Sequence, residues 1–260
     1  MPRKPILSPT RIGTYLECAV KYRYIYIDKI GRFYLRARPG YSFGSTLHNV
    51  LQAFHEEVRV TGEPQSVEKM LEEVETRWIS AGYVSMEQER EFRAAGAEVI
   101  GAYHVAVTER IANGVETIWT EKTLSTDMGS FKLNGRVDRI DRHADGSLEI
   151  IDYKSGRWEI TPDDVADSLA MNIYQFILRR MEPGVRVFAT IYALRSGMQA
   201  SAEMTDMDAD RFGADMLALG EEILNRDYVN IEPRRIANCG SCEFISRCET
   251  YWRRQQDWLE

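Results

Sequence analysis

The chain has 260 residues, of which 44% are hydrophobic and 28% are charged, so it is long enough to bury a sizeable core as one domain. It contains no run of about 18 apolar residues, which argues against a membrane span. The basic N-terminus lacks the apolar segment of a secretory signal. The net charge of −7 argues against a general polyanion-binding protein. We therefore expect a soluble, cytoplasmic protein.

The charge is unevenly distributed along the chain. Residues 1–38 contain nine lysines and arginines against only Glu17 and Asp28, a balance of +7, so the remainder carries −14. A local basic face of this kind is sufficient for contacts with phosphates. A solvated charged surface is the alternative explanation.

Capping residues, chain breakers and hydrophobic periodicity predict the secondary structure in chain order. Ser8 and Pro9 begin a helix, which we extend through Cys18 to about Tyr26, and a basic, aromatic loop at 29–42 follows. Further helices are predicted at about 43–60, 66–80, 87–112, 161–180 and 206–225, and strands at about 116–126, 131–142, 147–154, 185–194 and 199–204.

This order of elements predicts an α/β fold with a mixed central β-sheet flanked by helices. We expect one domain over residues 1–260. It consists of a mainly helical N-terminal part at 1–115, a core containing the sheet at 116–230 and a cysteine-bearing segment at 231–260.

The predicted strands at 131–142 and 147–154 flank an Asp-Gly turn, which is a strong hairpin signal. A hairpin brings Asp138 of the first strand close to Asp152 of the second, and alternation puts Asp152 and Lys154 on one face. Two carboxylates and a lysine predict a site that holds a hard divalent cation and positions a water. The alternative is a pair of strand-edge carboxylates with a solvated lysine.

The four cysteines form a pattern of one plus three: Cys18 stands alone, and Cys239, Cys242 and Cys248 cluster near the C-terminus. A cytosolic protein is not expected to keep them as disulfides. The pattern fits four-thiolate ligation of an iron–sulfur cluster or of zinc. Either metal would join the two ends of the chain. Four unrelated buried thiols are the alternative.

Together these residues resemble the PD-(D/E)XK nuclease superfamily, and within it the RecB-like branch that carries a four-cysteine iron–sulfur cluster. That branch includes AddAB-type helicase–nucleases and CRISPR-associated RecB-like exonucleases. The matching elements follow the family order over nearly the whole chain: Cys18, Gly44-x-x-x-His48, Asp138, Asp152-Tyr153-Lys154, the helix with Tyr174, and Cys239, Cys242 and Cys248.

The resemblance implies a restriction-endonuclease-like core at 116–230 and an iron–sulfur segment at 231–260. It implies Mg²⁺ or Mn²⁺ held by His48, Asp138, Asp152 and the backbone carbonyl of Tyr153, with Lys154 assisting the attacking water. It also implies a 4Fe–4S cluster on the four cysteines, with structural Zn²⁺ as the alternative.

The chain departs from the family pattern on the helix that carries Tyr174, which is a further expected catalytic residue. The family's glutamine falls at Ala170, whose methyl group cannot form a hydrogen bond. Asn172 and Gln175 lie nearby in sequence but point in other directions around the helix. This departure bears on the role of the helix and on the level of activity.

Basic and aromatic residues alternate over residues 21–36, a pattern suited to single-stranded DNA. We expect the tyrosines of the first helix to pack in the core. The loop at 32–38 is expected to contact DNA. The expected DNA-binding residues are Arg32, Arg36, Arg38 and Arg157.

Two other residues are interpreted more conservatively. Glu121 precedes the hairpin on a neighbouring strand, and we expect it to be a surface charge, with a carboxylate near the metal as the alternative. His55 lies two helical turns after His48 and matches no motif position, so we expect it to be structural.

These features predict a metal-dependent DNA nuclease that hydrolyses phosphodiester bonds. We expect an exonuclease that acts at DNA ends in repair, recombination or CRISPR adaptation. The expected partners are DNA, single-stranded or with free ends, and helicase or CRISPR-integrase proteins, with no membrane. The alternative is a non-catalytic, cluster-stabilised module that binds DNA ends or forms part of a helicase or integration complex.

Overall fold

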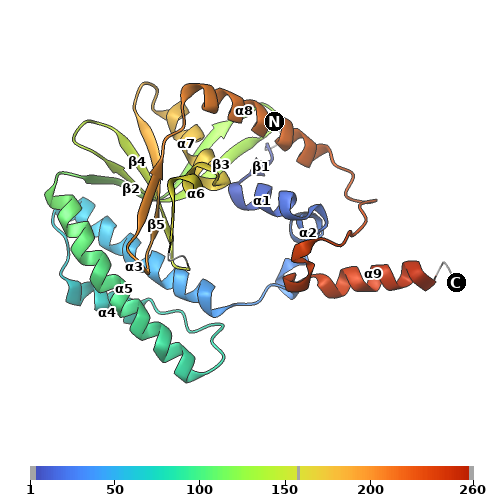
Figure 1. Cartoon of the computed structure of the whole chain (residues 1–260), viewed down its shortest axis with the longest axis horizontal. Coiled ribbons are helices and arrows are strands. Elements are labelled where there is room, and N and C mark those ends of the chain that lie inside the picture. Colours follow the sequence, from blue (N-terminus) through green and yellow to red (C-terminus); the bar gives the residue numbers. More distant parts are fainter. Residues whose placement is uncertain (1–3, 157–158, 258–260) are drawn as a thin grey trace.

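A computed structural model describes residues 4–156 and 159–257. It has an α/β architecture in which an open, mixed β-sheet is flanked by helices, consistent with a restriction-endonuclease-like fold (Figure 1). No helix in the described part of the chain is long and apolar enough to cross a membrane.

Within residues 4–156 and 159–257, the sheet has six strands. They are β1 (Ile6–Leu7), β2 (Glu116–Asp127), β3 (Lys132–Arg142), β4 (Leu148–Lys154), β5 (Val187–Ala193) and β6 (Gln199–Ala202). Their spatial order is β1-β3-β4-β5-β6, and β2 pairs with the other edge of β3. The β1/β3 and β4/β5 pairs are parallel, whereas β2/β3, β3/β4 and β5/β6 are antiparallel.

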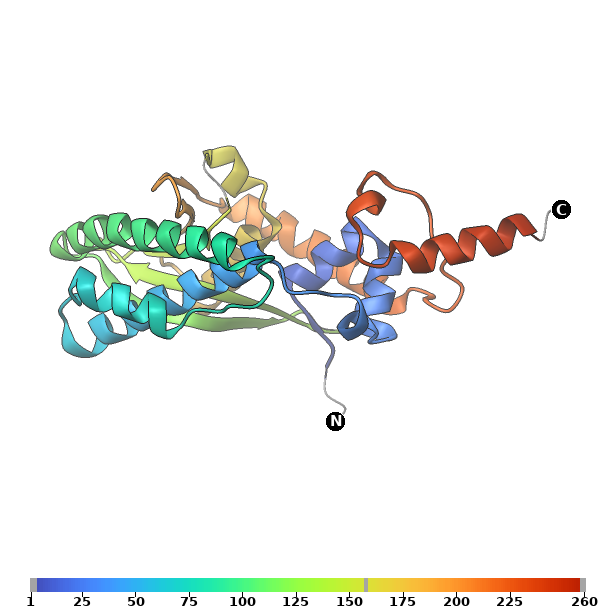
Figure 2. The same cartoon turned by 90° about the horizontal axis from the view of Figure 1, so that it is seen from below.

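The helices cover both faces of this sheet. They are α1 (Pro9–Glu17), α2 (Ala19–Tyr22), α3 (Pro39–Thr61), α4 (Val67–Thr76), α5 (Met86–Ala112), α6 (Pro162–Ala166), α7 (Leu169–Met181), α8 (Asp206–Asn225) and α9 (Ile245–Asp257). Helices α3, α4 and α5 lie on one side of the sheet, and α1, α7 and α8 on the other (Figure 1). Helix α9 projects away from the sheet at one end of the molecule (Figure 2).

Each face of the sheet has its own hydrophobic core. The α3-side core contains Leu47, Leu51, Ile100, Ile151 and Tyr153, among others. The α7-side core contains Val137, Ile140, Ile150, Ile177 and Ile191, among others. Strand β4 is buried from Leu148 to Tyr153, because both of its faces are covered.

The predicted elements of the hairpin and of the long central helices are confirmed, except that α3 begins at Pro39, inside the loop predicted at 29–42. Three further differences lie elsewhere. The first predicted helix is interrupted at Cys18, whose backbone is extended (φ −163°), and its Sγ accepts a hydrogen bond from Lys21 N at the start of α2. The helix predicted at 161–180 is two helices, α6 and α7, because Ser168 caps a new start. The short strand β1 was not predicted, since two residues carry too little pattern.

Candidate functional site

The site forms where β3 separates from β4. The β3/β4 pairing begins at Arg139↔Ile151 and continues away from Asp138. At the point of separation, Asp138 Oδ2 accepts a hydrogen bond from the backbone N–H of Tyr153 at 2.8 Å. The carboxylate therefore takes the place of a ladder hydrogen bond and fixes its own position against β4.

His48 reaches this point from α3. A Cβ on Gly44 would lie only 2.8 Å from Ser155 Oγ, just beyond the end of β4. Glycine therefore lets α3 approach the strand end closely. His48 is one turn further along the same helix face. This packing gives a physical reason for the Gly-x-x-x-His spacing.

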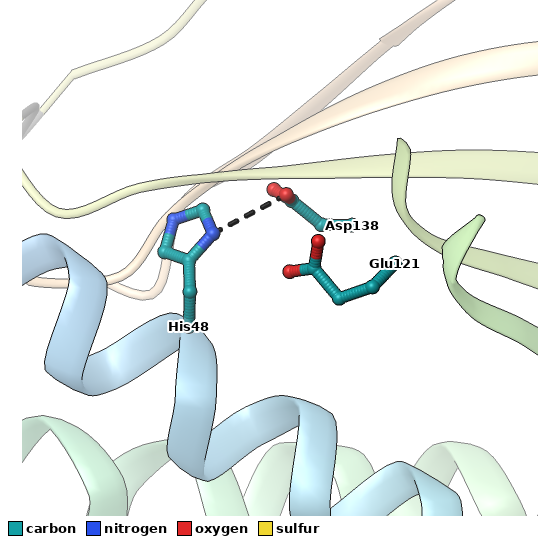
Figure 3. Close-up of side chains that lie close together, drawn as sticks. All are labelled: His48, Glu121 and Asp138. Atoms are coloured by element: carbon teal, nitrogen blue, oxygen red, sulfur yellow. Dashed lines mark ion pairs between the residues drawn. The ribbon is translucent and has the colours of Figure 1, made fainter. Parts of the chain in front are cut away.

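The two ring nitrogens of His48 both face oxygen atoms. Nε2 lies 3.2 Å from the carbonyl oxygen of Tyr153, and Nδ1 lies 3.2 Å from Asp138 Oδ1 (Figure 3). Burial alone would lower the pKa of His48, but the hydrogen bond and charge of Asp138 outweigh it and raise the pKa above its usual value. Without a metal, the doubly protonated imidazolium suits both contacts.

Glu121 lies opposite Asp138 in the β2/β3 ladder, between the pairs Thr120↔Arg139 and Lys122↔Val137. Its φ of 47° is in the left-handed region, where a non-glycine residue is strained. Its side chain is 14% exposed and forms an ion pair with Arg136.

The expectation that Glu121 is a surface charge is wrong. Ligand atoms of His48, Glu121 and Asp138 all lie within 4.8 Å of one another (Figure 3). Within the described residues, this is the only such group of three or more His, Cys, Asp or Glu side chains. The sequence gives no signal for a left-handed residue within a strand.

The pleat of β3 is also irregular at this position. Val137 belongs to the α7-side core, whereas Arg139, two residues later, donates to His55 of α3 on the other side. In a regular strand these two side chains would share a face. The irregularity lets one short segment serve both cores and place Asp138 between them.

Asp152 and Lys154 share one face of β4, as predicted. Lys154 Nζ lies 2.6 Å from Asp152 Oδ2. That oxygen is shielded from solvent and accepts no hydrogen bond of good geometry, so the contact is an ion pair. Burial and the charge of Asp138 raise the pKa of Asp152 despite Lys154. Asp138 and Asp152 thus interact electrostatically across the point where the strands separate.

This donor set fits a divalent cation. One imidazole and several carboxylates are ligands that Mg²⁺ and Mn²⁺ accept. Burial and the charge of Asp138 also raise the pKa of Glu121. Buried carboxylates that repel one another gain from a cation placed between them. Asp152, also expected as a ligand, is not in the group whose ligand atoms lie within 4.8 Å of one another, and its shielded Oδ2 faces Lys154.

Tyr174 of α7 covers the site from the α7 side. Burial, followed by the charges of Asp152 and Asp138, raises the pKa of Tyr174, so its hydroxyl stays protonated near these carboxylates. Ala170 is partly buried against the α7-side core. Neither nearby amide replaces the family glutamine: Asn172 donates to the Ala166 carbonyl, and buried Gln175 accepts from Met204 N.

The PD-(D/E)XK nuclease superfamily model matches residues 6–249. The chain belongs to this superfamily. Superfamily membership implies a nuclease that uses divalent metal ions and acts on DNA. A solved structure titled "Crystal structure of SSO0001" is similar to the chain at 14% sequence identity, covering 88% of this chain and 96% of that one, with a TM-score of 0.30. No curated protein matches the sequence.

A buried polar network supports the strands of this superfamily core from the α3 side. Arg139 donates to His55 and Tyr103 and forms an ion pair with Asp141, and Tyr103 in turn contacts the hydroxyl of Tyr153. Burial, with a smaller contribution from Arg139, holds the pKa of His55 well below its usual value, so it is neutral. His55 therefore behaves as the structural residue that we expected.

The four cysteines lie outside the superfamily's metal site and line one pocket between the first helices and the C-terminal segment. Cys18, Cys242 and Cys248 pack against buried Val20 and Phe244. Burial, followed by the nearby Cys18, raises the pKa of Cys248 to about 11. The thiols that are distant in sequence are therefore neighbours in a largely apolar setting.

The residues expected to bind DNA have different surroundings. Arg32 and Arg36 are exposed, and the Arg32 guanidinium lies 4.7 Å from the ring centroid of Phe33. Arg38 forms an ion pair with Glu243 at 2.8 Å. Arg157 lies outside the described residues. Tyr22 and Tyr24 are buried, as expected for core residues.

Proposed function

We propose that this protein is a Mg²⁺- or Mn²⁺-dependent deoxyribonuclease of the RecB-like type that hydrolyses phosphodiester bonds. The observation that carries the proposal is the convergence of His48, Glu121 and Asp138 within 4.8 Å, beside the Asp152–Lys154 ion pair. Nuclease chemistry needs a cation, a positioned water and a cationic side chain in one place, and these residues meet that need.

In the proposed mechanism, His48, Glu121, Asp138 and Asp152 would hold the divalent ion, with the Tyr153 carbonyl as a further ligand. When bound there, such an ion would supply positive charge for polarising the scissile phosphate and for lowering the pKa of a water. Binding requires His48 to release a proton, because its two N–H groups otherwise occupy Asp138 and Tyr153.

Lys154 then acts on the substrate side. Its side chain is 40% exposed, so the ammonium can turn from Asp152 toward a bound phosphate or water. There it orients the attacking water and stabilises negative charge that develops on the phosphate. The protonated hydroxyl of Tyr174 is available as a hydrogen-bond donor close to the same carboxylates.

We propose that the four cysteines bind a 4Fe–4S cluster with a structural role. Among the described residues, no three of their sulfurs lie within 4.8 Å of one another. A tetrahedral zinc with bonds of about 2.3 Å needs sulfurs about 3.8 Å apart, whereas an iron–sulfur cube, several ångströms wide, holds them farther apart. The cluster would join the chain ends around the core.

One observation favours zinc as the second candidate. The free space among the cysteines is only about 20 Å³, enough for about one water. By volume this space suits a single ion better than a cluster, but a zinc ion would require the sulfurs to move closer together. Iron, sulfide and zinc analysis of anaerobically purified protein decides between them.

We further propose that the enzyme is an exonuclease that acts at DNA ends in the cytoplasm, in repair, recombination or CRISPR adaptation, with a helicase or integrase partner. The second candidate function is a non-catalytic DNA-end-binding module, and Ala170 favours it, because no amide replaces the family glutamine. Labelled linear single-stranded, linear double-stranded and circular DNA, each incubated with Mg²⁺, Mn²⁺ or EDTA, test the proposal. Metal-dependent loss of linear DNA alone supports it, and binding without cleavage supports the module.

A further inference from the structure

Arg136 stands at the solvent side of the candidate metal site. Its side chain is 66% exposed, and its Nε lies 2.5 Å from Glu121 Oε2. Glu121 is far less exposed, at 14%. The guanidinium therefore occupies one oxygen of a carboxylate whose other neighbours are His48 and Asp138.

This ion pair competes with metal binding. The charge of Arg136 favours the ionised form of Glu121, but it also neutralises a ligand that a cation would use. Because the guanidinium is 66% exposed, solvent screens its attraction to Glu121 and weakens this ion pair. A phosphodiester offers Arg136 two oxygens in the planar geometry that a guanidinium binds best.

The backbone of Glu121 points to function rather than to stability. Its left-handed φ of 47° is strained, and such conformations gather at functional sites. A second cross-strand pair on the same two strands, Arg142–Glu116, shows the ordinary case. It is more open, at 3.6 Å, and both side chains are more than half exposed.

We propose that Arg136 is a phosphate-binding residue for the DNA strand, and that its transfer from Glu121 to a phosphate releases Glu121 to the divalent ion. This inference rests on the proposed nuclease function. One ion pair breaks and another forms, so the charge balance of the site is kept. DNA binding and metal binding then strengthen each other by the same factor, as linkage requires.

Four variants, Arg136→Gln, Arg136→Lys, Arg142→Gln and Glu121→Gln, test the inference. Mn²⁺ affinity is measured by calorimetry without DNA, and again with a cleavage-resistant phosphorothioate oligonucleotide. The salt dependence of binding of the same oligonucleotide is measured in EDTA by fluorescence anisotropy. Thermal unfolding checks that each variant is folded.

Arg136→Gln should change the affinities for Mn²⁺ and for DNA in opposite directions. Arg136→Gln should bind Mn²⁺ about three- to fivefold more tightly without DNA, because Glu121 is released. Its DNA binding should weaken, with a salt slope lower by about one unit. The gain in Mn²⁺ affinity that DNA produces should be smaller than in the wild type. The affinities and the salt slope of Arg136→Lys should lie between those of the wild type and of Arg136→Gln. Arg142→Gln should match the wild type in all three measurements.

Other outcomes separate failure of the inference from failure of the proposed function. Unchanged or weaker Mn²⁺ binding by folded Arg136→Gln would overturn the inference, and so would an unchanged salt slope. If Arg136→Gln does not fold, Arg136→Lys with wild-type values in all three measurements would overturn it. Absence of Mn²⁺ binding by the wild type, or wild-type affinity in Glu121→Gln, would overturn the metal site itself.

Discussion

The ring of Tyr174 packs directly against the backbone of Gly135, and the contact leaves no space for a side chain. A Cβ on Gly135 would stand 2.5 Å from both Tyr174 Cδ1 and Cε1. Gly135 lies on β3 just before Asp138, and Tyr174 lies on α7. The absence of a side chain at Gly135 thus sets the distance between α7 and β3.

Gly135→Ala should displace Tyr174 and destabilise the protein by about 1–3 kcal/mol, as overpacking does. Cleavage should fall as well, because the tyrosine hydroxyl moves away from the carboxylates. Gly101→Ala is the control. A Cβ added at Gly101 on α5 would have no neighbouring side chain or packed element within 4 Å, so alanine should stabilise that helix by about 0.5–1 kcal/mol. Denaturant unfolding and cleavage rates check both. Equal stability of the two variants would contradict the close contact.

Asp152→Asn and Lys154→Ala should each reduce cleavage by about 10²–10⁴-fold while the fold remains. The two side chains are within ion-pair distance beside the proposed metal site, and each is proposed to act in the transition state. Lys69→Ala, which removes an exposed lysine of α4 paired with Glu72, is the control and should cleave at the wild-type rate. Wild-type turnover by both site variants would refute their assignment.

The hairpin and its charged residues could be predicted because their signals are local. Alternation, the Asp-Gly turn and the spacing of Asp138 and Asp152 all lie within residues 131–154. The cysteine pattern anticipated that the four thiols lie at one pocket, whereas the metal that they bind remains a prediction. Helix α8 was predicted with its bounds, because Thr205 caps it with a complete capping box.

The remaining features depend on tertiary packing. Glu121 adopts a left-handed φ that no glycine or asparagine announces. The break at Cys18 falls inside a helical pattern, and Cys18 lines a pocket together with residues of the C-terminal segment. The importance of Gly44 appears only when Ser155 of another element is placed beside it. Such contacts join residues far apart in sequence.

Mn²⁺ affinity should rise with pH through a midpoint above the ordinary histidine pKa of about 6.5. The pKa of His48 is raised, chiefly because Asp138 outweighs the effect of burial, and the metal must displace its proton. In the metal-free protein, the contribution of His48 to stability changes with pH in the opposite direction. The stability contributed by protonated His48 is fully present below pH 6.5 and is lost as the pH rises through the raised folded-state pKa.

Two measurements check this prediction. Calorimetric titrations with Mn²⁺ between pH 6 and 8.5 give the midpoint. In EDTA, the wild type should unfold at a higher temperature than His48→Asn at low pH, and this difference in Tm should shrink as the pH rises across the same range. An advantage that grows with pH would show that His48 is neutral in the metal-free protein.

Replacing Arg32 and Arg36 together by glutamine should flatten the salt dependence of DNA binding by up to about two units. Both side chains are exposed in the basic N-terminal part. Adding Arg38→Gln should change the slope less, because Arg38 is already paired with Glu243. Arg59→Gln, at the far end of α3, is the control. An unchanged slope in the double variant would place the DNA path elsewhere.

Cys18→Ser should remove the cluster and lower thermal stability without changing the Mn²⁺ affinity of the site at His48 and Asp138. The cysteine pocket joins chain segments more than 200 positions apart, and ligation couples directly to folding. A cross-link of this span is comparable to a disulfide, which contributes about 2–4 kcal/mol, and each kcal/mol lowers Tm by about 2–4 °C in a protein of this size.

Val20→Ala, in the same apolar cluster, measures the loss of packing alone and should keep the iron. Absorbance near 400 nm, iron and sulfide content, Tm and Mn²⁺ affinity are compared for the three proteins. A colourless, zinc-loaded and fully active wild type would rule out the iron–sulfur cluster, and unchanged Tm in Cys18→Ser would rule out a structural cross-link of either kind.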